Sequence, residues 1–282
     1  MKNKRIIAAA MATGMAVSLA ACGGSASTTD TTGTADAATT EAADAATGEG
    51  TGFTVQLGPN PETLDPALNA AVDGGNTLIT IEEPLLIIDE NNEIQPGQAE
   101  SYEVSDDGLV WTFHLRDNVT WVDVNGNEKA KLTADDFMTG MEWVLNFYKN
   151  DSANVSMPSE MIQGAKEYYE YTKTLTEEQA YQLTAGDGSK FREMVGLETP
   201  DDYTLVYHCL AEKPYFDSLA TYNSLYPAPK ALVEQMGPEA YRAINNETMW
   251  YNGCYTMTEY LQGNQKVYTK NPMYWDQDCT LF

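Results

Sequence analysis

Apolar and polar residues alternate along several short stretches of the chain, and elsewhere apolar residues recur with helical spacing. The alternation predicts strands at residues 53–57, 85–89, 102–104, 109–116, 203–210, 255–261 and 266–270. Helices are predicted at residues 77–83, 134–148 and 230–236, with a further helix start at Thr176. The chain therefore combines predicted strands with predicted helices.

The stretch Trp111–Trp121 places a histidine, an arginine and an aspartate between aromatic residues. Side chains alternate between the two faces of a strand. Trp111 and Phe113 therefore share one face with Leu115, and His114 shares the other with Arg116. The pattern indicates a two-sided structural strand rather than a catalytic cluster.

Local signals mark where helices begin. Thr133 and Thr176 each have the spacing of a capping box, which ends at Asp136 and at Gln179. Pro229 suits the first position of the helix after it. The Gly74–Gly75 pair favours turning backbone, so Asn76 is expected to cap the helix over 77–83.

The N-terminal region has the pattern of a secretory signal. Lys2, Lys4 and Arg5 precede an uncharged apolar run over 6–20, and Leu19–Cys22 follows with small residues before a cysteine. Residues 1–21 are therefore interpreted as a lipoprotein signal peptide, with Cys22 as the lipidated first residue of the mature chain. Ordinary cleavage, leaving Cys22 as a spare thiol, is the alternative.

Residues 22–50 contain only Ala, Gly, Ser, Thr and acidic residues after Cys22, a composition that predicts a disordered tether. The whole chain carries a net charge of −26 at pH 7. The signal takes three of the 16 basic residues and no acid, leaving 13 against 42 and a net charge of −29. Such an acidic chain argues against nucleic acid as a partner.

The sequence contains no nucleotide-binding loop, no nucleophile elbow and no zinc-protease motif, so we expect no catalytic residue, no metal and no cofactor. Cys209, Cys254 and Cys279 lack metal-site spacing. They are expected to be unpaired within strands, with one disulfide and one thiol as the alternative. Many tyrosines and tryptophans suit the lining of a ligand cleft or the filling of a core.

Five segments in order carry a resemblance to a known family. They are ETLDP, the stretch from Glu82 to Trp121, LTADDF, NGCYTMTEY and KNPMYWD. Together they resemble the extracellular solute-binding proteins of family 5, the peptide- and nickel-binding lipoproteins of ABC importers. The resemblance covers about Thr51 to Asp276.

The resemblance implies an α/β fold, that of the type II periplasmic binding proteins of the peptide-binding cluster. It divides the chain into a first lobe (51–83 and 201–276), an inserted α+β domain (84–200) and the start of a second lobe (277–282). The rest of that second lobe, which closes the cleft in the family and holds an acidic residue for the peptide amine, is missing from this sequence.

Ligand contacts are also implied by the resemblance. In the family, extended backbone after the LDP segment pairs with the peptide, and the matching residues here are Ala70, Ala71 and Val72. The NGCY segment resembles a turn at the cleft and adds Asn252, Gly253 and Tyr255. Cys254 departs from the small residue or proline of the family.

The expected function is that of a lipid-anchored receptor, not an enzyme, that captures short peptides and delivers them to ABC permease subunits. We expect a monomer at the extracellular face of the cell membrane, or in the periplasm of a Gram-negative cell. A truncated surface lipoprotein with an interaction or signalling role is the alternative from another class. Peptides, nickel complexes and other solutes are not distinguished by the sequence.

Overall fold

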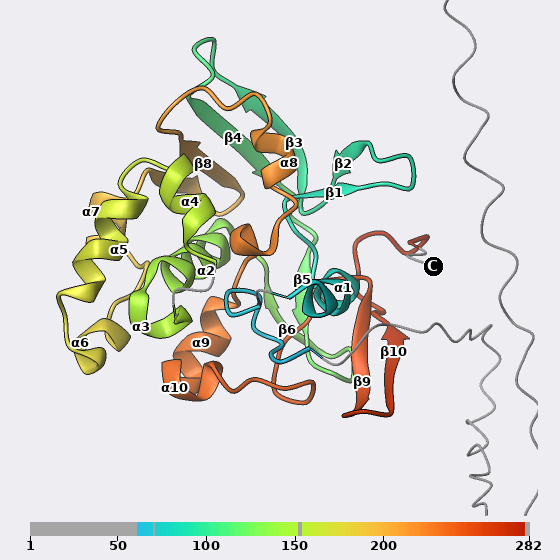
Figure 1. Ribbon diagram of the computed structural model, residues 1–282. Helices are drawn as coiled ribbons and strands as arrows, with labels where there is room; N and C mark the ends of the chain where they lie inside the picture. Colours follow the sequence, from blue (N-terminus) through green and yellow to red (C-terminus); the bar gives the residue numbers. More distant parts are fainter. Residues whose placement is uncertain (1–60, 70, 152–153, 280–282) are drawn as a thin grey trace, which may run out of the picture. The chain divides into compact units, whose positions relative to one another are not determined.

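The computed structural model describes residues 61–69, 71–151 and 154–279 (Figure 1). Its helices are α1 (Val72–Ile81), α2 (Ala134–Leu145), α3 (Phe147–Asn150), α4 (Ser156–Met161), α5 (Ala165–Lys173), α6 (Glu177–Tyr181), α7 (Lys190–Met194), α8 (Phe216–Leu219), η1 (Asn223–Leu225), α9 (Lys230–Met236) and α10 (Pro238–Tyr241). Within these ranges, no helix combines the length and the hydropathy that a membrane span requires.

The strands form one four-stranded sheet and three hairpins. They are β1 (Leu86–Ile88), β2 (Ile94–Pro96), β3 (Ala99–Val104), β4 (Val110–Leu115), β5 (Thr120–Val122), β6 (Glu128–Lys131), β7 (Leu197–Asp201), β8 (Thr204–His208), β9 (Tyr255–Leu261) and β10 (Gln265–Lys270). The sheet has the order β3-β4-β8-β7, and β1-β2, β5-β6 and β9-β10 pair separately. All pairs are antiparallel.

The sheet confirms the two faces predicted for residues 109–116. Trp111, Phe113 and Leu115 of β4 are buried, while the residues between them are half-buried. Phe113 meets the ring of Tyr207 on β8 edge to face, with centroids 5.8 Å apart. The stretch from Trp111 therefore belongs to the core of a sheet, as its alternation indicates.

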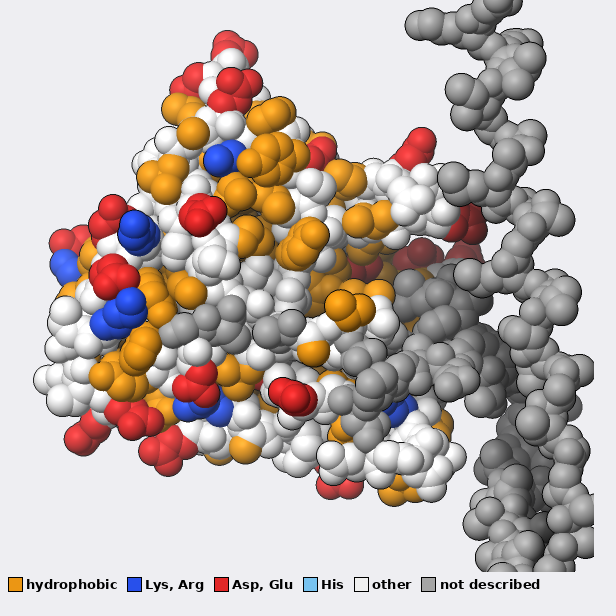
Figure 2. All heavy atoms as spheres, viewed as in Figure 1, with side chains coloured by type: hydrophobic (Ala, Val, Ile, Leu, Met, Phe, Trp, Pro, Cys, Tyr) orange, Lys and Arg blue, Asp and Glu red, His pale blue; other side chains and the backbone are white. Residues whose placement is uncertain are grey.

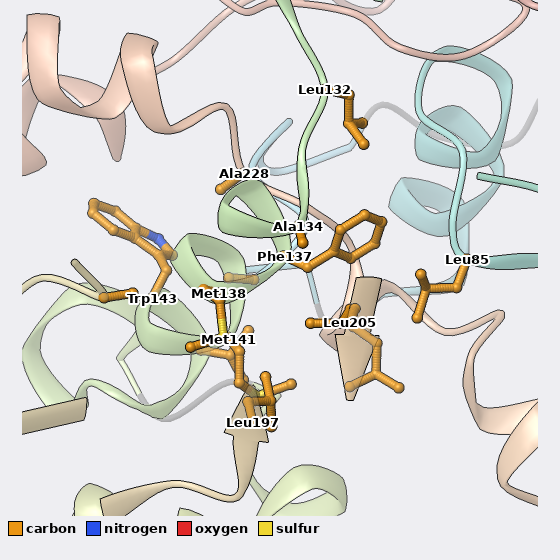
Figure 3. Close-up of a cluster of buried hydrophobic side chains, with 14 of the residues drawn as sticks. Leu85, Leu132, Ala134, Phe137, Met138, Met141, Trp143, Leu197, Leu205 and Ala228 are labelled. Atoms are coloured by element: carbon orange, nitrogen blue, oxygen red, sulfur yellow. The ribbon is translucent and has the colours of Figure 1, made fainter. Parts of the chain in front are cut away.

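Helix α2 lies at the centre of the buried cluster. Figure 3 shows Phe137, Met138 and Met141 projecting from α2 toward Leu197 of β7 and Leu205 of β8. All five are 2 % exposed or less. Burying such side chains contributes roughly 1.5–3 kcal/mol each, so this contact between helix and sheet is a main source of stability.

The edge strand β3, on the same face of the sheet, is more open. Tyr102 and Val104 of β3 are exposed, as is Tyr215 beside α8. Figure 2 shows apolar side chains gathered over this part of the surface, with acidic side chains around it. Tyr102 is stacked on Trp111 at a centroid distance of 5.4 Å, so its ring extends the aromatic core outward.

The start predicted for the first helix is wrong. The helix begins at Val72 rather than after Asn76, and it contains Gly74 and Gly75. A Cβ at Gly74 would lie 1.8 Å from Oδ1 of Asn69, so glycine is needed for this close approach. Glycine therefore occupies this helical position despite its low helix propensity, because a side chain there would clash with Asn69.

Of the four predicted helix starts, at Asn76, Thr133, Thr176 and Pro229, two are confirmed. Both capping boxes are present, at Thr133 before α2 and at Thr176 before α6. Pro229, predicted as a first helical residue, is instead the residue before α9. Cys209 and Cys254 were expected inside strands, but they lie just after β8 and just before β9.

The four-stranded sheet bears on the predicted division into lobes. Strand β8 follows residue 200 in the chain, yet it pairs with both β4 and β7. A boundary at residue 200 therefore separates strands of a single sheet. We propose that the inserted domain, defined by sheet membership, extends through His208; the division itself stays a prediction.

The side chain of Asp136 should be a critical structural carboxyl. It accepts hydrogen bonds from Thr133 N at 2.9 Å, Trp121 Nε1 at 3.1 Å and Lys230 N at 2.8 Å. Removing it leaves three donors without their acceptor, one of them the buried indole of Trp121, so Asp136→Ala should lower the free energy of unfolding by about 3–4 kcal/mol. Urea denaturation followed by tryptophan fluorescence measures the change.

The adjacent Asp135→Ala variant is the matched control. Asp135 is partly exposed and pairs with Arg192 and Lys230 at the surface. Its loss should cost about 1 kcal/mol or less. Equal destabilisation by the two variants would contradict the structural role of Asp136.

Candidate functional site

The segment before α1 is held by a buried aspartate. Asp65 accepts a hydrogen bond from Ala67 N at 2.9 Å and another from Trp143 Nε1 at 2.9 Å. Burial raises the pKa of Asp65 to about 6, although these hydrogen bonds act in the opposite direction. Asp65 thereby fixes the turn of the LDP segment against α2.

Two asparagines then fix the end of this segment. Nδ2 of Asn154 donates to the carbonyl oxygens of Pro66 at 3.1 Å and Asn69 at 2.7 Å. Nδ2 of Asn223 donates to the same two carbonyls, each at 2.9 Å. The backbone leading into α1 is thus held by side chains from distant parts of the chain.

This anchoring places Ala71 and Val72 at the surface. Ala71 is exposed and extended, with φ −110° and ψ 143°, and Val72 is the first residue of α1. The side chain of Val72 is 81 % exposed. Because the first N–H groups of a helix have no acceptor within the helix, main chain at this position is suited to bind an external acceptor.

The Asn252–Tyr255 loop lies at the other end of α1. Oδ1 of Asn252 accepts the backbone N–H of Glu83 at 3.1 Å, and its Nδ2 donates to the Glu83 carbonyl at 3.4 Å. Asn252 is buried, so its amide is occupied in holding the chain just after α1. Tyr255, by contrast, is half-buried at the start of β9.

Gly253 is required by a close backbone contact. Its N–H donates to Ile81 O at 3.1 Å, and a Cβ would lie 2.6 Å from the Ile81 carbonyl carbon. Asn271 Nδ2 donates to the Gly253 carbonyl at 2.9 Å. The loop therefore joins the last turn of α1 to the segment after β10.

Glu83 connects this junction to an aromatic pair. The hydroxyl of Tyr274 and Nε1 of Trp275 both donate to its carboxylate, the second at 2.7 Å. The guanidinium of Arg116 lies over the Trp275 ring, 3.6 Å from its centroid. Burial raises the pKa of Glu83 to about 7, partly offset by the two hydrogen bonds and by Arg116.

Glu82 is buried beside Glu83, and fewer hydrogen bonds offset the burial of its carboxyl group. Its Oε2 atom has no hydrogen-bond partner among the residues that the structure describes. Burial, and then the charge of Asp65, raise the pKa of Glu82 well above its usual value. The end of α1 therefore carries two carboxyl groups whose neutral forms are favoured.

The structure separates the predicted ligand residues into two groups. Gly253 contacts the last turn of α1, whereas Val72 begins it, so the ten-residue helix puts about 15 Å between them. Ala70 lies outside the described residues. Asn252 and Gly253 are buried, which leaves Ala71, Val72 and Tyr255 as the accessible members of the predicted set.

Sequence reasoning did not single out Glu83, Arg116 or Trp275. The signal was present, because Glu82 and Glu83 interrupt an apolar stretch directly before Pro84. Carboxyl groups flanked by buried residues need partners. Their partners lie up to 192 residues away, and no local spacing reveals them.

Glu83 should make folding stability depend on pH. Its pKa rises from 4.5 in the unfolded chain to about 7 in the fold, so the folded state holds the proton longer. The contribution of Glu83 to stability is therefore complete below pH 4.5 and is lost as pH rises toward 7, by roughly 3 kcal/mol. In urea denaturation between pH 5 and 8, the free energy of unfolding of Glu83→Gln should fall less than that of the wild type, by about this amount.

Glu100→Gln, which changes an exposed carboxyl on β3, serves as the control and should leave the pH dependence of the wild type intact. A steeper fall for Glu83→Gln than for the wild type would show that the sign is wrong.

Comparisons with known proteins place these features in a family. The model of the bacterial extracellular solute-binding proteins, family 5 (middle), matches residues 93–280. The periplasmic oligopeptide-binding protein OppA of Haemophilus influenzae is 31% identical over 227 residues, which are 80% of this chain and 37% of that protein. The oligopeptide-binding protein AmiA of Streptococcus pneumoniae is 27% identical, over 78% of this chain and 30% of that protein.

Solved structures agree with the sequence comparisons. A periplasmic oligopeptide-binding protein of Borrelia burgdorferi superimposes with a TM-score of 0.64 at 26% identity, covering 79% of this chain and 39% of that one. OppA of Haemophilus influenzae, in complex with RPPGFSPFR, gives 0.63 at 28% identity and covers 78% of this chain and 38% of that one.

The chain thus spans less than two fifths of the length of these relatives, and its fold is that of the corresponding part of periplasmic oligopeptide-binding proteins. The matched relatives are solute-binding proteins rather than enzymes. On the match of the family model over residues 93–280 and the shared fold, the chain belongs to the bacterial extracellular solute-binding proteins of family 5.

Proposed function

We propose that the chain is the lipid-anchored, extracellular solute-binding component of an ABC importer, which captures short peptides and delivers them to a membrane permease. The exposure of Ala71 and Val72 carries this proposal. The segment before them, from Asp65 to Asn69, is held by hydrogen bonds from Trp143 and Asn154. The chain belongs to a family whose relatives are named for binding oligopeptides.

Main-chain recognition suits a ligand of variable sequence. Every peptide offers the same N–H and C=O groups, so hydrogen bonds to extended backbone give affinity without selecting side chains. Ala71 is extended, and the buried anchors around it reduce the entropy lost when a peptide binds. Tyr255, at the other end of α1, would contact a more distant part of the ligand.

The anchor and tether extend the proposal to the cell surface. Cys22 and residues 23–50 lie outside the described residues, so the support here is their sequence alone. A flexible segment of this length has a root-mean-square span of about 30 Å, enough to let the folded part reach a permease in the same membrane. Two or more acyl chains on Cys22 would hold it there.

Replacing Val72 by proline tests the main-chain contact without disturbing the helix. Proline is favoured at the first helical position, and Ala71 already has the extended backbone that proline requires before it. Val72→Pro should weaken peptide binding at least about tenfold, because the N–H is lost. Isothermal titration of the full chain with a pool of short peptides measures the affinity.

Val72→Ala keeps the N–H and is the matched control, expected to bind like the wild type. Equal affinities for the proline and alanine variants would rule out the contact at this N–H. If the wild type binds no peptide but binds a metal chelate or a sugar, the assigned ligand class is wrong.

Lipidation makes a separate prediction. In cells fed an alkyne-labelled fatty acid, the wild-type chain should incorporate the label and fractionate with membranes. Cys22→Ala should lose the label and appear in the soluble fraction or the medium. Label retained by Cys22→Ala would place the acyl chain elsewhere.

A further inference from the structure

Two cysteines from separate segments meet beside the Asn252–Tyr255 loop. Cys254 precedes β9 and is buried, and Cys279 closes the turn that begins at Asp276. Sγ of Cys254 lies 3.6 Å from the carbonyl oxygen of Cys279. Both cysteines are free in the structure and lie 25 residues apart in the chain.

The surroundings hold both segments in place. The N–H of Asn271 donates to Cys254 O at 2.8 Å, which ties the residue after β10 to the residue before β9. On the other side, Glu83 binds Tyr274 and Trp275, only a few residues before Cys279. The N–H of Cys279 donates to Asp276 O at 3.2 Å, so this turn is closed as well.

The two thiols have opposite electrostatic tendencies. A hydrogen bond from the Cys254 thiol lowers the pKa of Cys279, whereas the hydrogen bond to Cys279, and then burial, raise the pKa of Cys254. Cys279 is also the more accessible of the two. Cys209 differs from both, because burial raises the pKa of its thiol to about 11.

We propose that Cys254 and Cys279 are a redox pair that closes into a disulfide when the protein meets a disulfide-containing oxidant. The Cys279 thiolate attacks one sulfur of the oxidant and releases the other as a thiolate. Cys254 then loses its proton to that thiolate and attacks Sγ of Cys279, which releases the second thiol. Two protein thiols are oxidised and one external disulfide is reduced.

The bond would lock the turn that directly follows Trp275 to the residue next to Tyr255. It closes a loop that contains the whole β9-β10 hairpin, and in the chain-entropy account such a crosslink destabilises the unfolded state. Neither the pairing nor its consequence depends on which solute the protein binds.

The test incubates the purified 282-residue chain with oxidised glutathione, followed by peptide mapping by mass spectrometry. The wild type should yield a peptide linking Cys254 to Cys279, lighter by two hydrogen atoms than its reduced parts. Cys209→Ser is the matched control, since it removes another buried thiol, and it should yield the same linked peptide. Thermal unfolding should shift upward by roughly 5 °C or more on oxidation.

Single variants test the order of attack. Cys254→Ser should trap glutathione on Cys279, whereas Cys279→Ser should leave Cys254 unmodified. Should either variant fail to fold, the maps of the wild type and of Cys209→Ser decide the proposal. Cys254 and Cys279 remaining free in those maps, or either one bonded to Cys22 or Cys209, would overturn it.

Discussion

The carboxyl of Glu83 is the contact on which the arrangement of the junction depends. It lies where α1 ends, and it binds the hydroxyl of Tyr274 and the indole of Trp275, from the far end of the described chain. Its own backbone is held by Asn252. The chain just after α1 thus meets two segments that lie at least 169 residues further along, one at the backbone of Glu83 and one at its carboxyl, which must be shielded from water. The desolvation of this carboxyl is offset only while all three remain in place.

The same arrangement makes it difficult to separate the residues that stabilise the fold from the candidate binding residues. Asn252 and Gly253 were expected at the cleft on the basis of family resemblance, yet their polar groups serve the fold itself. A segment can recur in a family because it maintains a backbone contact, as Gly253 does against Ile81. Ala71 and Val72 differ, because hydrogen bonds from Asn154 and Asn223 fix the backbone before them while both residues stay exposed to solvent.

Several features that depend only on residues near one another in the sequence were predicted correctly. The alternation of apolar and polar residues predicted the two faces of β4. The capping-box spacing, a threonine with a carboxyl or amide residue three positions later, predicted the starts of α2 and α6. The start of α1 could not be predicted, because glycine disfavours a helix and the sequence does not show that Asn69 fills the space beside Gly74. The network around Glu83 was inaccessible for a related reason, since its partners are fixed by tertiary structure.

The buried carboxyls have a thermodynamic consequence. Asp65, Asp136 and Glu83 have pKa values of about 6 to 7 in the fold, all raised by burial. In weakly acidic solution the folded chain therefore carries protons that the unfolded chain gives up. Unfolding under these conditions is a proton-releasing reaction, and the released protons are taken up by the buffer. Its heat of protonation becomes part of the measured enthalpy, so calorimetry in phosphate and in imidazole would report different heats for the same unfolding event.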